Sequence, residues 1–346
     1  MTLLSDIYEQ PAILRHLLSN QSQVARKIAE AIHSHDVHYV FLAARGTSDN
    51  AGRYAQYLWG AFNGLPIALA TPSLFTLYQQ PPRLKGMLVV GVSQSGQSPD
   101  IVSVLTEGKR QGCLTLAITN TPESPLAQTA DFVIDIQAGL ETAVAATKTY
   151  TAELMAIAML SVALRGDVPA HHEMLNAAPG WVTQMLQLDE SIARIAQRYR
   201  FVEQCVVLGR GFNYSTAFEW SLKLKELTYV AAEPYSSADF QHGPIAVVEQ
   251  GYPVMAIVPS GQVFENILPL LRYLRAGRRA ELLVISDRSE ALSLAQSPIA
   301  LPAGMPEWVS PLVSIVPAQL FCHHLTRAKG YDTETPRGLH KVTETR

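Results

Sequence analysis

VHYVFLAARGTS, at residues 37–48, and EQCVVLGRGFN, at residues 203–213, decide the fold of this chain. Each is an apolar run that leads into an Arg-Gly turn, and Arg210 stands 165 residues after Arg45. Further pairs keep this order at nearly the same spacing: Ser95-Gly96 with Ser260-Gly261, Ile118-Thr119-Asn120 with Ile285-Ser286-Asp287, and Ala138-Gly139 with Ala303-Gly304. This agreement predicts that the chain contains two copies of one domain.

Each copy alternates short apolar runs with longer segments of helical periodicity. In the first copy, the runs predict strands near 38–43, 66–70, 87–92, 114–119 and 132–136, and helices near 50–62, 99–111 and 143–164. Continuous rather than alternating apolar residues indicate strands that are covered on both faces. The order β-α-β-α therefore predicts an α/β fold with a parallel sheet and right-handed crossovers. Such sheets bind ligands at the carboxyl ends of their strands.

The segments outside the two copies divide the chain further. We expect an N-terminal helical segment (1–34), a first domain (35–168), a linking helix (169–198), a second domain (199–335) and a C-terminal tail (336–346). Pro179-Gly180 is expected to interrupt the linking helix, because this dipeptide is typical of turns.

Composition excludes several classes of protein. The 346 residues are 48% hydrophobic with a formal net charge of -3, which does not favour nucleic-acid or anionic-membrane partners. No apolar stretch approaches the roughly 20 residues that span a bilayer, and the N-terminus lacks a signal-peptide pattern. Cys113, Cys205 and Cys322 show no C-x-x-C spacing, which predicts buried thiols in a reducing compartment. We expect a cytoplasmic protein.

Small neutral donors gather in two turns that follow predicted strands. The first turn contains Gly46, Thr47 and Ser48; the second, VSQSGQSPD at 92–100, contains Ser93, Gln94, Ser95 and Ser98. Glycines let the backbone approach closely, and Pro99 suits a first helical turn whose amides point at the same place. Each turn alone is most simply a polar loop with a helix cap. Two at adjacent strand ends predict a phosphate site built from dipoles. Neither the Walker pattern nor G-x-G-x-x-G is present.

The segment SLKLKELTYV places three charged residues on one helical face. Glu219, Lys223 and Glu226 stand at i, i+4 and i+7. The simplest interpretation is a surface ion pair worth a few tenths of a kcal/mol. The helix is apolar around much of its circumference, however, so we expect the stripe to be enclosed. An enclosed Glu beside a Lys is a candidate general base.

Two further residues are candidates for proton transfer or covalent catalysis. His242 precedes Gly243-Pro244, and histidine is suited to proton transfer near neutral pH. Lys341 lies in the tail after Pro336 and Gly338; a lysine forms a Schiff base when its pKa is lowered, but a charged tail is usually a frayed end. No residues show the spacing of a metal site, and no metal or organic cofactor is expected.

Seven ordered motifs resemble the sugar isomerase (SIS) superfamily: RGTSDNAG, SQSGQSPD, ETAVAATKTY, LGRG, LKLKE, HGPIAVVE and GLHKVTE. The resemblance runs from about residue 35 to the C-terminus. It is closest to the isomerase half of glutamine–fructose-6-phosphate aminotransferases. It implies two tandem SIS domains, each a five-stranded parallel sheet in a three-layer α/β/α, flavodoxin-like arrangement.

The resemblance also implies roles by position. Phosphate-binding positions match Ser48, Ser93, Gln94, Ser95 and Ser98, and backbone contacts to the sugar match Val144 and Ala145. Glu226 matches the base that moves a proton between C1 and C2, and Lys223 matches a supporting lysine. His242 matches a ring-opening histidine that reaches a neighbouring subunit's site, which implies a homodimer with shared active sites. Lys341 matches the lysine that forms a Schiff base with the ketose phosphate.

Departures from the aminotransferase pattern indicate the reaction. The chain starts MTLLSDIYEQ and shows no glutaminase cysteine, so we expect that it draws no ammonia from glutamine. Arg45 stands where these synthases usually have Cys, and RGTSDNAG looks more like the stand-alone SIS-type glucosamine-6-phosphate deaminases. The resemblance therefore implies conversion of glucosamine 6-phosphate to fructose 6-phosphate and ammonia. A fructosamine-6-phosphate deglycase, an ammonia-dependent glucosamine-6-phosphate synthase and a non-catalytic sugar-phosphate sensor remain alternatives.

The two copies differ in the second turn. IVPSGQVFE, at 257–265, has Val258, Pro259 and Val263 where the first copy has Ser93, Gln94 and Ser98. The duplicate keeps the turn but loses most donors. We therefore expect one phosphate per chain, in the first domain, with the second domain supplying Glu226, His242 and the tail.

Overall fold

The computed structural model of the protein describes residues 2–166 and 168–341. In this part of the chain, two parallel five-stranded sheets share one topology. The first has the order β2-β1-β3-β4-β5 and the second the order β10-β9-β8-β6-β7, which is the same order read from the opposite edge. The order 2-1-3-4-5 is that of flavodoxin-like folds. The predicted duplication and the α/β class are confirmed.

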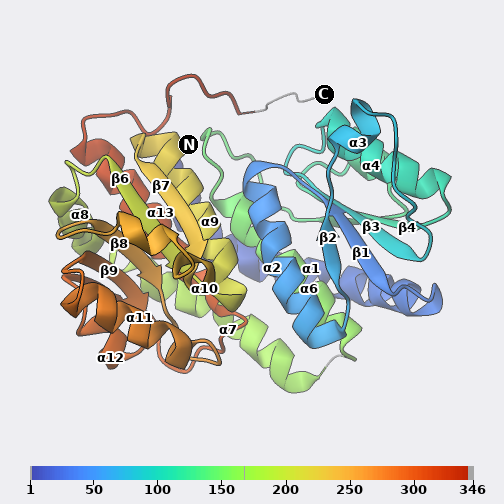
Figure 1. Cartoon of the computed structure of the whole chain (residues 1–346). Helices are drawn as coiled ribbons and strands as arrows, with labels where there is room; N and C mark the ends of the chain where they lie inside the picture. The colour runs from blue at the N-terminus through green and yellow to red at the C-terminus, as the bar shows by residue number, and fades with distance from the viewer. Residues whose placement is uncertain (1, 167, 342–346) are drawn as a thin grey trace. The chain divides into compact units, whose positions relative to one another are not determined.

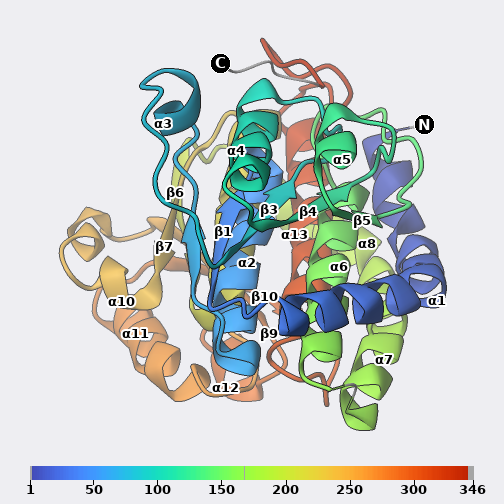
Figure 2. The same cartoon turned by 90° about the vertical axis from the view of Figure 1, so that its right-hand side faces the viewer.

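The first sheet consists of short strands near the predicted positions: β1 (Tyr39–Ala43), β2 (Ile67–Leu69), β3 (Met87–Val92), β4 (Leu114–Thr119) and β5 (Phe132–Asp135). Its helices are α2 (Gly46–Asn63), α3 (Ser73–Thr76), α4 (Pro99–Arg110), α5 (Pro125–Thr129) and α6 (Lys148–Leu164). Figure 1 shows α2 and α6 on one face of this sheet and α3 and α4 on the other. Figure 2 shows α5 close to α4, and the two helices contact each other. The three layers explain why these strands are apolar on both sides.

The second sheet repeats this arrangement with β6 (Gln204–Gly209), β7 (Ala231–Ser236), β8 (Pro253–Ile257), β9 (Glu281–Ser286) and β10 (Ser297–Ala300). Its helices are α8 (Asp189–Arg198), α9 (Tyr214–Lys223), α10 (Ser237–Phe240), α11 (Phe264–Ala276), α12 (Ser289–Leu292) and α13 (Ser310–Ala328). α13 packs against α8 and α9, and α11 packs against α12. Helices α9, α11, α12 and α13 therefore take the places that α2, α4, α5 and α6 have in the first copy.

Two long helices complete the described chain. α1 (Leu3–Ser34) precedes the first sheet, and α7 (Pro169–Leu186) follows α6. The internal contacts of the chain divide it into two compact units. One consists mainly of residues 9–142 and 146–179, and the other mainly of residues 180–339. We call these the first and second units.

The prediction that Pro179-Gly180 interrupts the linking helix is wrong. α7 passes through both residues, and the break comes at Gln187 and Leu188, just before α8. Proline lacks an N–H, so Pro179 removes one hydrogen bond from the helix. Pro179 and the preceding Ala178 are buried, and this packing holds the helical conformation despite the missing bond.

The cysteines lie in the interior, as predicted. Cys113, Cys205 and Cys322 are buried and form no disulfide. Burial raises the pKa of the Cys205 thiol to about 12, so it is not a nucleophilic thiolate near neutral pH. In the part of the chain that the structure describes, none of the helices combines the length and apolar character that a membrane span requires.

Candidate active site

The SQSGQS turn joins the end of β3 to the start of α4. Ser93 Oγ accepts the N–H of Gly96 at 3.1 Å, and Ser95 Oγ accepts the N–H of Gln97 at 3.3 Å. Ser98 is the N-cap residue of α4, yet its side chain makes no capping hydrogen bond. Pro99 occupies the first helical turn, as predicted. The hydroxyl of Ser98 and the first amides of α4 thus lie at the same end of the helix, which is the arrangement that binds anions.

Gly96 is required by the geometry of this turn. Its φ is +62°, a conformation that side chains rarely adopt. A Cβ built on Gly96 would lie 2.0 Å from the hydroxyl oxygen of Ser124. The left-handed backbone conformation and the close packing against Ser124 both disfavour a side chain, so glycine is the residue that fits this position.

The Arg-Gly turn after β1 holds its own polar contacts. Ser48 Oγ donates to Glu153 Oε1 of α6 at 2.8 Å, and both residues are buried. A hydroxyl has a single proton, so Ser48 in this state can receive a further hydrogen bond but cannot donate one. That property suits a sugar hydroxyl better than a phosphate oxygen. Gly46, with a φ of +53°, and Thr47 begin α2 beside it.

A buried carboxylate organises the loop that precedes α6. Glu141 Oε1 accepts the N–H of Thr147 at 2.8 Å and that of Thr149 at 3.3 Å. Glu141 Oε2 accepts the Thr149 hydroxyl at 2.8 Å and Lys341 Nζ at 2.9 Å. Burial alone would raise the pKa of Glu141, but the charge and N–H of Lys341 and the threonine donors hold it below its usual value. Lys341 of the C-terminal tail is therefore bound to a buried residue of the first unit.

Val144 and Ala145 lie within this loop of the sequence. Val144 is half-buried, and Ala145 is buried. Neither side chain is polar, so any hydrogen bond to a ligand at these positions comes from the backbone, as the resemblance implied.

Lys223 and Glu226 form a close ion pair in the second unit. Lys223 Nζ lies 2.5 Å from Glu226 Oε2 and 3.4 Å from Glu219 Oε1. Lys223 and Glu219 are buried, and about a quarter of the Glu226 side chain is exposed. The predicted enclosure of this stripe is confirmed for Glu219 and Lys223, whereas Glu226 is partly exposed. The helix changes to a π turn over Leu224–Thr228, a feature that is frequent at functional sites.

His242 follows α10 in a turn of the second unit. The residue is exposed, and Gly243 beside it has a φ of +134°. Among the described residues, no hydrogen bond involves its imidazole ring. An exposed histidine of this kind is accessible to a ligand or to another protein chain.

The start of the tail is anchored on the π turn. Tyr229 ends that turn in a left-handed conformation, with a φ of +57°. Its hydroxyl accepts the N–H of Arg337 at 2.9 Å, and the Arg337 guanidinium lies 3.8 Å from the centre of the Tyr229 ring. Pro336 to Gly338 are thus directed by specific contacts rather than frayed.

The duplicate turn in the second unit is filled by carboxylates. Asp287 accepts the Ser260 N–H at 2.6 Å and its hydroxyl at 2.5 Å. Glu307 accepts the N–H of Gln262 at 2.7 Å, and a Cβ built on Gly261 would lie 2.1 Å from Glu307 Oε2. A Cβ on Gly211, in the second Arg-Gly turn, would lie 3.7 Å from Glu307 Oε1. A carboxylate of the chain itself therefore lies at both turns of the second copy.

Three acidic residues of these sites were not predicted from the sequence: Glu141, Glu153 and Glu307. Each is an isolated acidic residue in the sequence, and no short motif around it indicates a role. A weak signal existed for Glu141, which is followed by three threonines within eight residues in ETAVAATKT. Nothing comparable marks Glu153 or Glu307, because their partners are distant in sequence.

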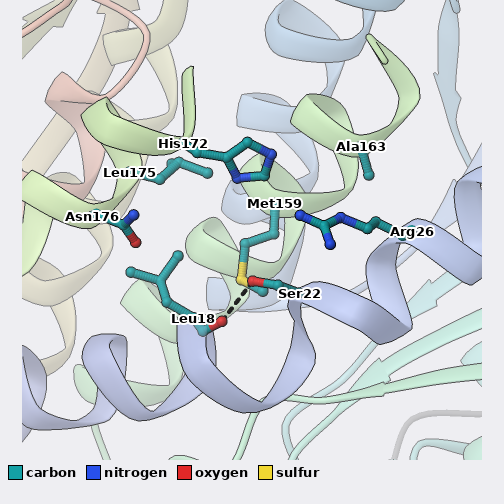
Figure 3. A pocket seen from close by; sticks show the side chains of 8 residues that line it. All are labelled: Leu18, Ser22, Arg26, Met159, Ala163, His172, Leu175 and Asn176. Atoms are coloured by element: carbon teal, nitrogen blue, oxygen red, sulfur yellow. Dashed lines mark hydrogen bonds between the residues drawn. The ribbon is translucent and has the colours of Figure 1, made fainter. Parts of the chain in front are cut away.

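A separate cavity lies among helices of the first unit. It has a volume of about 340 Å³ and is lined by residues of α1, α6 and α7, including Arg26, Met159, His172 and Asn176 (Figure 3). None of the predicted site residues lines it. Met159 lies near the C-terminal end of α6, whereas Glu141 and its partners lie at the other end of that helix. This cavity is therefore distinct from the candidate site.

Comparison with protein families and curated proteins gives consistent matches. The model of the SIS domain matches residues 35–163 and 201–326. The glutamine–fructose-6-phosphate aminotransferase (isomerizing) of Gloeobacter violaceus is 34% identical over 98% of this chain, and that of Aquifex aeolicus is 33% identical over 98%. The chain spans 58% and 57% of the length of these two relatives.

Solved structures show the same fold. The C-terminal domain of glucosamine-fructose-6-phosphate aminotransferase from Francisella tularensis superposes with a TM-score of 0.87 and 29% identity, covering 96% of this chain and 98% of that one. Glucosamine-6-phosphate deaminase from Thermotoga maritima gives a TM-score of 0.80 at 20% identity, and each chain is covered completely, at 100%. The second likeness concerns the fold alone.

Proposed function

Because the chain belongs to the SIS domain family of phosphosugar isomerases, we propose that it converts glucosamine 6-phosphate into fructose 6-phosphate and ammonia. The Lys223–Glu226 ion pair carries this proposal. A partly exposed carboxylate held beside a buried ammonium is suited to moving a proton between two carbon atoms.

The first unit binds the phosphate in this proposal. Donors come from the SQSGQS turn, from Ser93, Gln94, Ser95 and Ser98, and from the first amides of α4. Support comes from the uncapped hydroxyl of Ser98 at the helix N-terminus. Ser48 is assigned to a sugar hydroxyl rather than to the phosphate, because its proton is directed to Glu153. Gly46 and Thr47 complete this side, and the backbone of Val144 and Ala145 contacts the sugar.

The reaction begins on the open-chain aldehyde, after His242 assists ring opening. Glu226 removes the proton from C2 and returns a proton to C1, while O1 gains the proton that the C2 amine loses and becomes a hydroxyl. The C2–N bond becomes an imine. Water then adds to C2, ammonia leaves, and the C2 ketone of fructose 6-phosphate remains. A positioned base of this kind contributes about 10²–10⁴-fold to the rate.

Lys341 acts as a cation in this scheme. An ammonium that donates to a buried carboxylate at 2.9 Å is not a nucleophile, so a Schiff base requires the Glu141–Lys341 pair to open first. As a cation, Lys341 stabilises the negative charge that develops on the substrate oxygen. Lys223 holds the carboxylate of Glu226 in one position.

We further propose a homodimer in which His242 serves the partner's site. Support comes from the exposed position of His242, whose ring makes no hydrogen bond with the described residues. Two experiments test this dimer: measurement of the mass of the protein in solution, and measurement of the activity of mixed dimers formed from Glu226→Gln and His242→Ala chains. Recovery of activity on mixing supports shared sites.

A second candidate is the reverse direction, formation of the amino sugar from fructose 6-phosphate and ammonia. The observation that favours it is the 33–34% identity to aminotransferases. Incubation with fructose 6-phosphate and either ammonium or glutamine distinguishes the donors.

The deciding experiment is a substrate panel. Glucosamine 6-phosphate should yield equal amounts of ammonia and fructose 6-phosphate, and Glu226→Gln should slow the formation of both by about 10²–10⁴-fold. Release of an amino acid from a fructosamine 6-phosphate, without turnover of the amino sugar, would replace the deaminase by a deglycase. Binding of sugar phosphates without turnover of any of them would support a non-catalytic sugar-phosphate sensor instead.

A further inference from the structure

Arg45 and Asp100 connect the two turns that contain the candidate phosphate donors. Arg45 is the N-cap residue of α2, in the Arg-Gly turn after β1, and Asp100 lies in the first turn of α4. Arg45 Nε donates to Asp100 Oδ2 at 2.8 Å. The guanidinium is half-exposed, whereas the carboxylate is 1% exposed. One contact thus joins the turn after β1 to the start of α4, the helix that follows the neighbouring strand β3.

The position of Asp100 creates an electrostatic problem for phosphate binding. The residue stands two positions after Ser98, the N-cap of α4, where the phosphate is expected. Its carboxylate also accepts the N–H of Ile101 at 2.9 Å, and this hydrogen bond holds the carboxylate at the first turn of α4. Like charges repel most strongly where water is excluded, and a sugar phosphate carries nearly two negative charges at neutral pH.

We propose that Arg45 is a positioning residue of the phosphate site. Its guanidinium neutralises Asp100 and ties the start of α4 to the Arg-Gly turn, so that the SQSGQS turn presents its donors to the phosphate beside Ser48, the residue assigned to a sugar hydroxyl. Arg45 acts through Asp100 and is not assigned a contact with the substrate. This inference rests on the proposed phosphate site of the first unit, but not on which amine the enzyme releases.

An ordinary surface ion pair would have no such role. Exposed pairs contribute little, because solvent screens them and both side chains lose freedom. Here one partner is buried, and removal of the other partner leaves a buried charge without this compensation. The effect should therefore appear in anion affinity as well as in stability, and it should vanish when Asp100 loses its charge.

The test compares four variants with the wild type: Arg45→Gln, Arg45→Lys, Asp100→Asn and the double variant Arg45→Gln/Asp100→Asn. Calorimetry measures the Kd for inorganic phosphate, and steady-state assays with glucosamine 6-phosphate measure KM and kcat. We expect Arg45→Gln to weaken phosphate binding by about tenfold, which corresponds to about 1.4 kcal/mol, and to raise KM with little change in kcat. Arg45→Lys keeps the charge and should retain most of the affinity.

The double variant is decisive, because it removes both charges but keeps the acceptor for Ile101. Its Kd should return to within about threefold of the wild-type value. Unchanged phosphate affinity in Arg45→Gln overturns the inference, and so does a double variant that binds as weakly as Arg45→Gln. A wild type that binds phosphate but deaminates nothing refutes the proposed reaction alone, since the affinities still decide the role of Arg45.

Discussion

The ammonium of Lys223 lies 2.5 Å from the carboxylate of Glu226, and the helix changes from α to π geometry between these two residues. In a π turn the side chains shift relative to α-helical spacing. Glu226 is thereby partly exposed while Lys223 stays buried against Glu219. The pair therefore couples a fixed buried charge to a carboxylate that a substrate can reach.

Glu226→Gln should lower kcat by about 10²–10⁴-fold, because the amide cannot accept the C2 proton. The Kd for inorganic phosphate should stay at the wild-type value, since the phosphate donors lie in the first unit. Lys225→Gln is the matched control, because Lys225 is exposed on the same turn. Full turnover by Glu226→Gln would remove Glu226 from the mechanism.

The repeat supplies its own control for the phosphate site. Ser95→Ala should weaken phosphate binding by about tenfold, since a hydrogen bond to a charged group is worth about 1.5–3 kcal/mol. Ser260→Ala, at the equivalent place in the second copy, should leave the affinity unchanged, because Ser260 is bonded to Asp287. Calorimetry should also give one phosphate per chain; two equal sites would contradict the asymmetry.

Gly96→Ala should destabilise the protein by about 1–3 kcal/mol and abolish phosphate binding, through both positive φ and collision with Ser124. Gly86→Ala isolates the first of these effects. Gly86 has a φ of +82°, and a Cβ there meets nothing within 4 Å. Urea unfolding should show the smaller loss for Gly86→Ala, with phosphate binding intact. Equal losses of stability in the two variants would show that the collision is relieved.

His323 should make stability depend on pH. The side chain is buried, and no hydrogen bond to its ring nitrogens occurs among the described residues. Burial and, to a smaller extent, the charges of His324 and Arg327 lower the pKa of His323 to about 4, while the charge of Asp189 opposes them. The unfolded chain binds this proton near pH 6.5, so stability is full above that pH and falls as the pH drops toward 4.

The expected loss approaches about 3 kcal/mol at the acidic end of this window. Urea unfolding between pH 7 and pH 4 measures it. His323→Leu should flatten the pH dependence, whereas His35→Gln, at an exposed histidine, should retain it. A wild-type slope in His323→Leu would assign the titration to other groups.

The sheets could be predicted closely from the sequence, because buried parallel strands are continuous apolar runs. The predicted bounds of 87–92 and 114–119 are those of β3 and β4. Helix starts were less accurate, since they depend on local contacts. The helix expected from 143 begins at Lys148, because Glu141 accepts the backbone N–H of Thr147, the N-cap residue, and that of Thr149 in the first turn.

The candidate site could be predicted where its chemistry is local. The hydroxyls of SQSGQS and the Lys223–Glu226 spacing are visible in short motifs. Long-range partners are not: the sequence assigned the tail to the second domain, whereas Lys341 pairs with Glu141, 200 positions away, in the first unit. An isolated acid reveals its partner only when the chain is folded.

The carboxylate of Glu307 occupies the turn of the second copy. The N–H of Gln262 already has its acceptor, and that acceptor is covalently part of the chain. The turn of the second copy therefore already has an acceptor in the place where an anion would bind, and we expect no further ordering of it by a phosphate ligand. We expect ligand-dependent protection from proteolysis or from hydrogen exchange in the first copy alone.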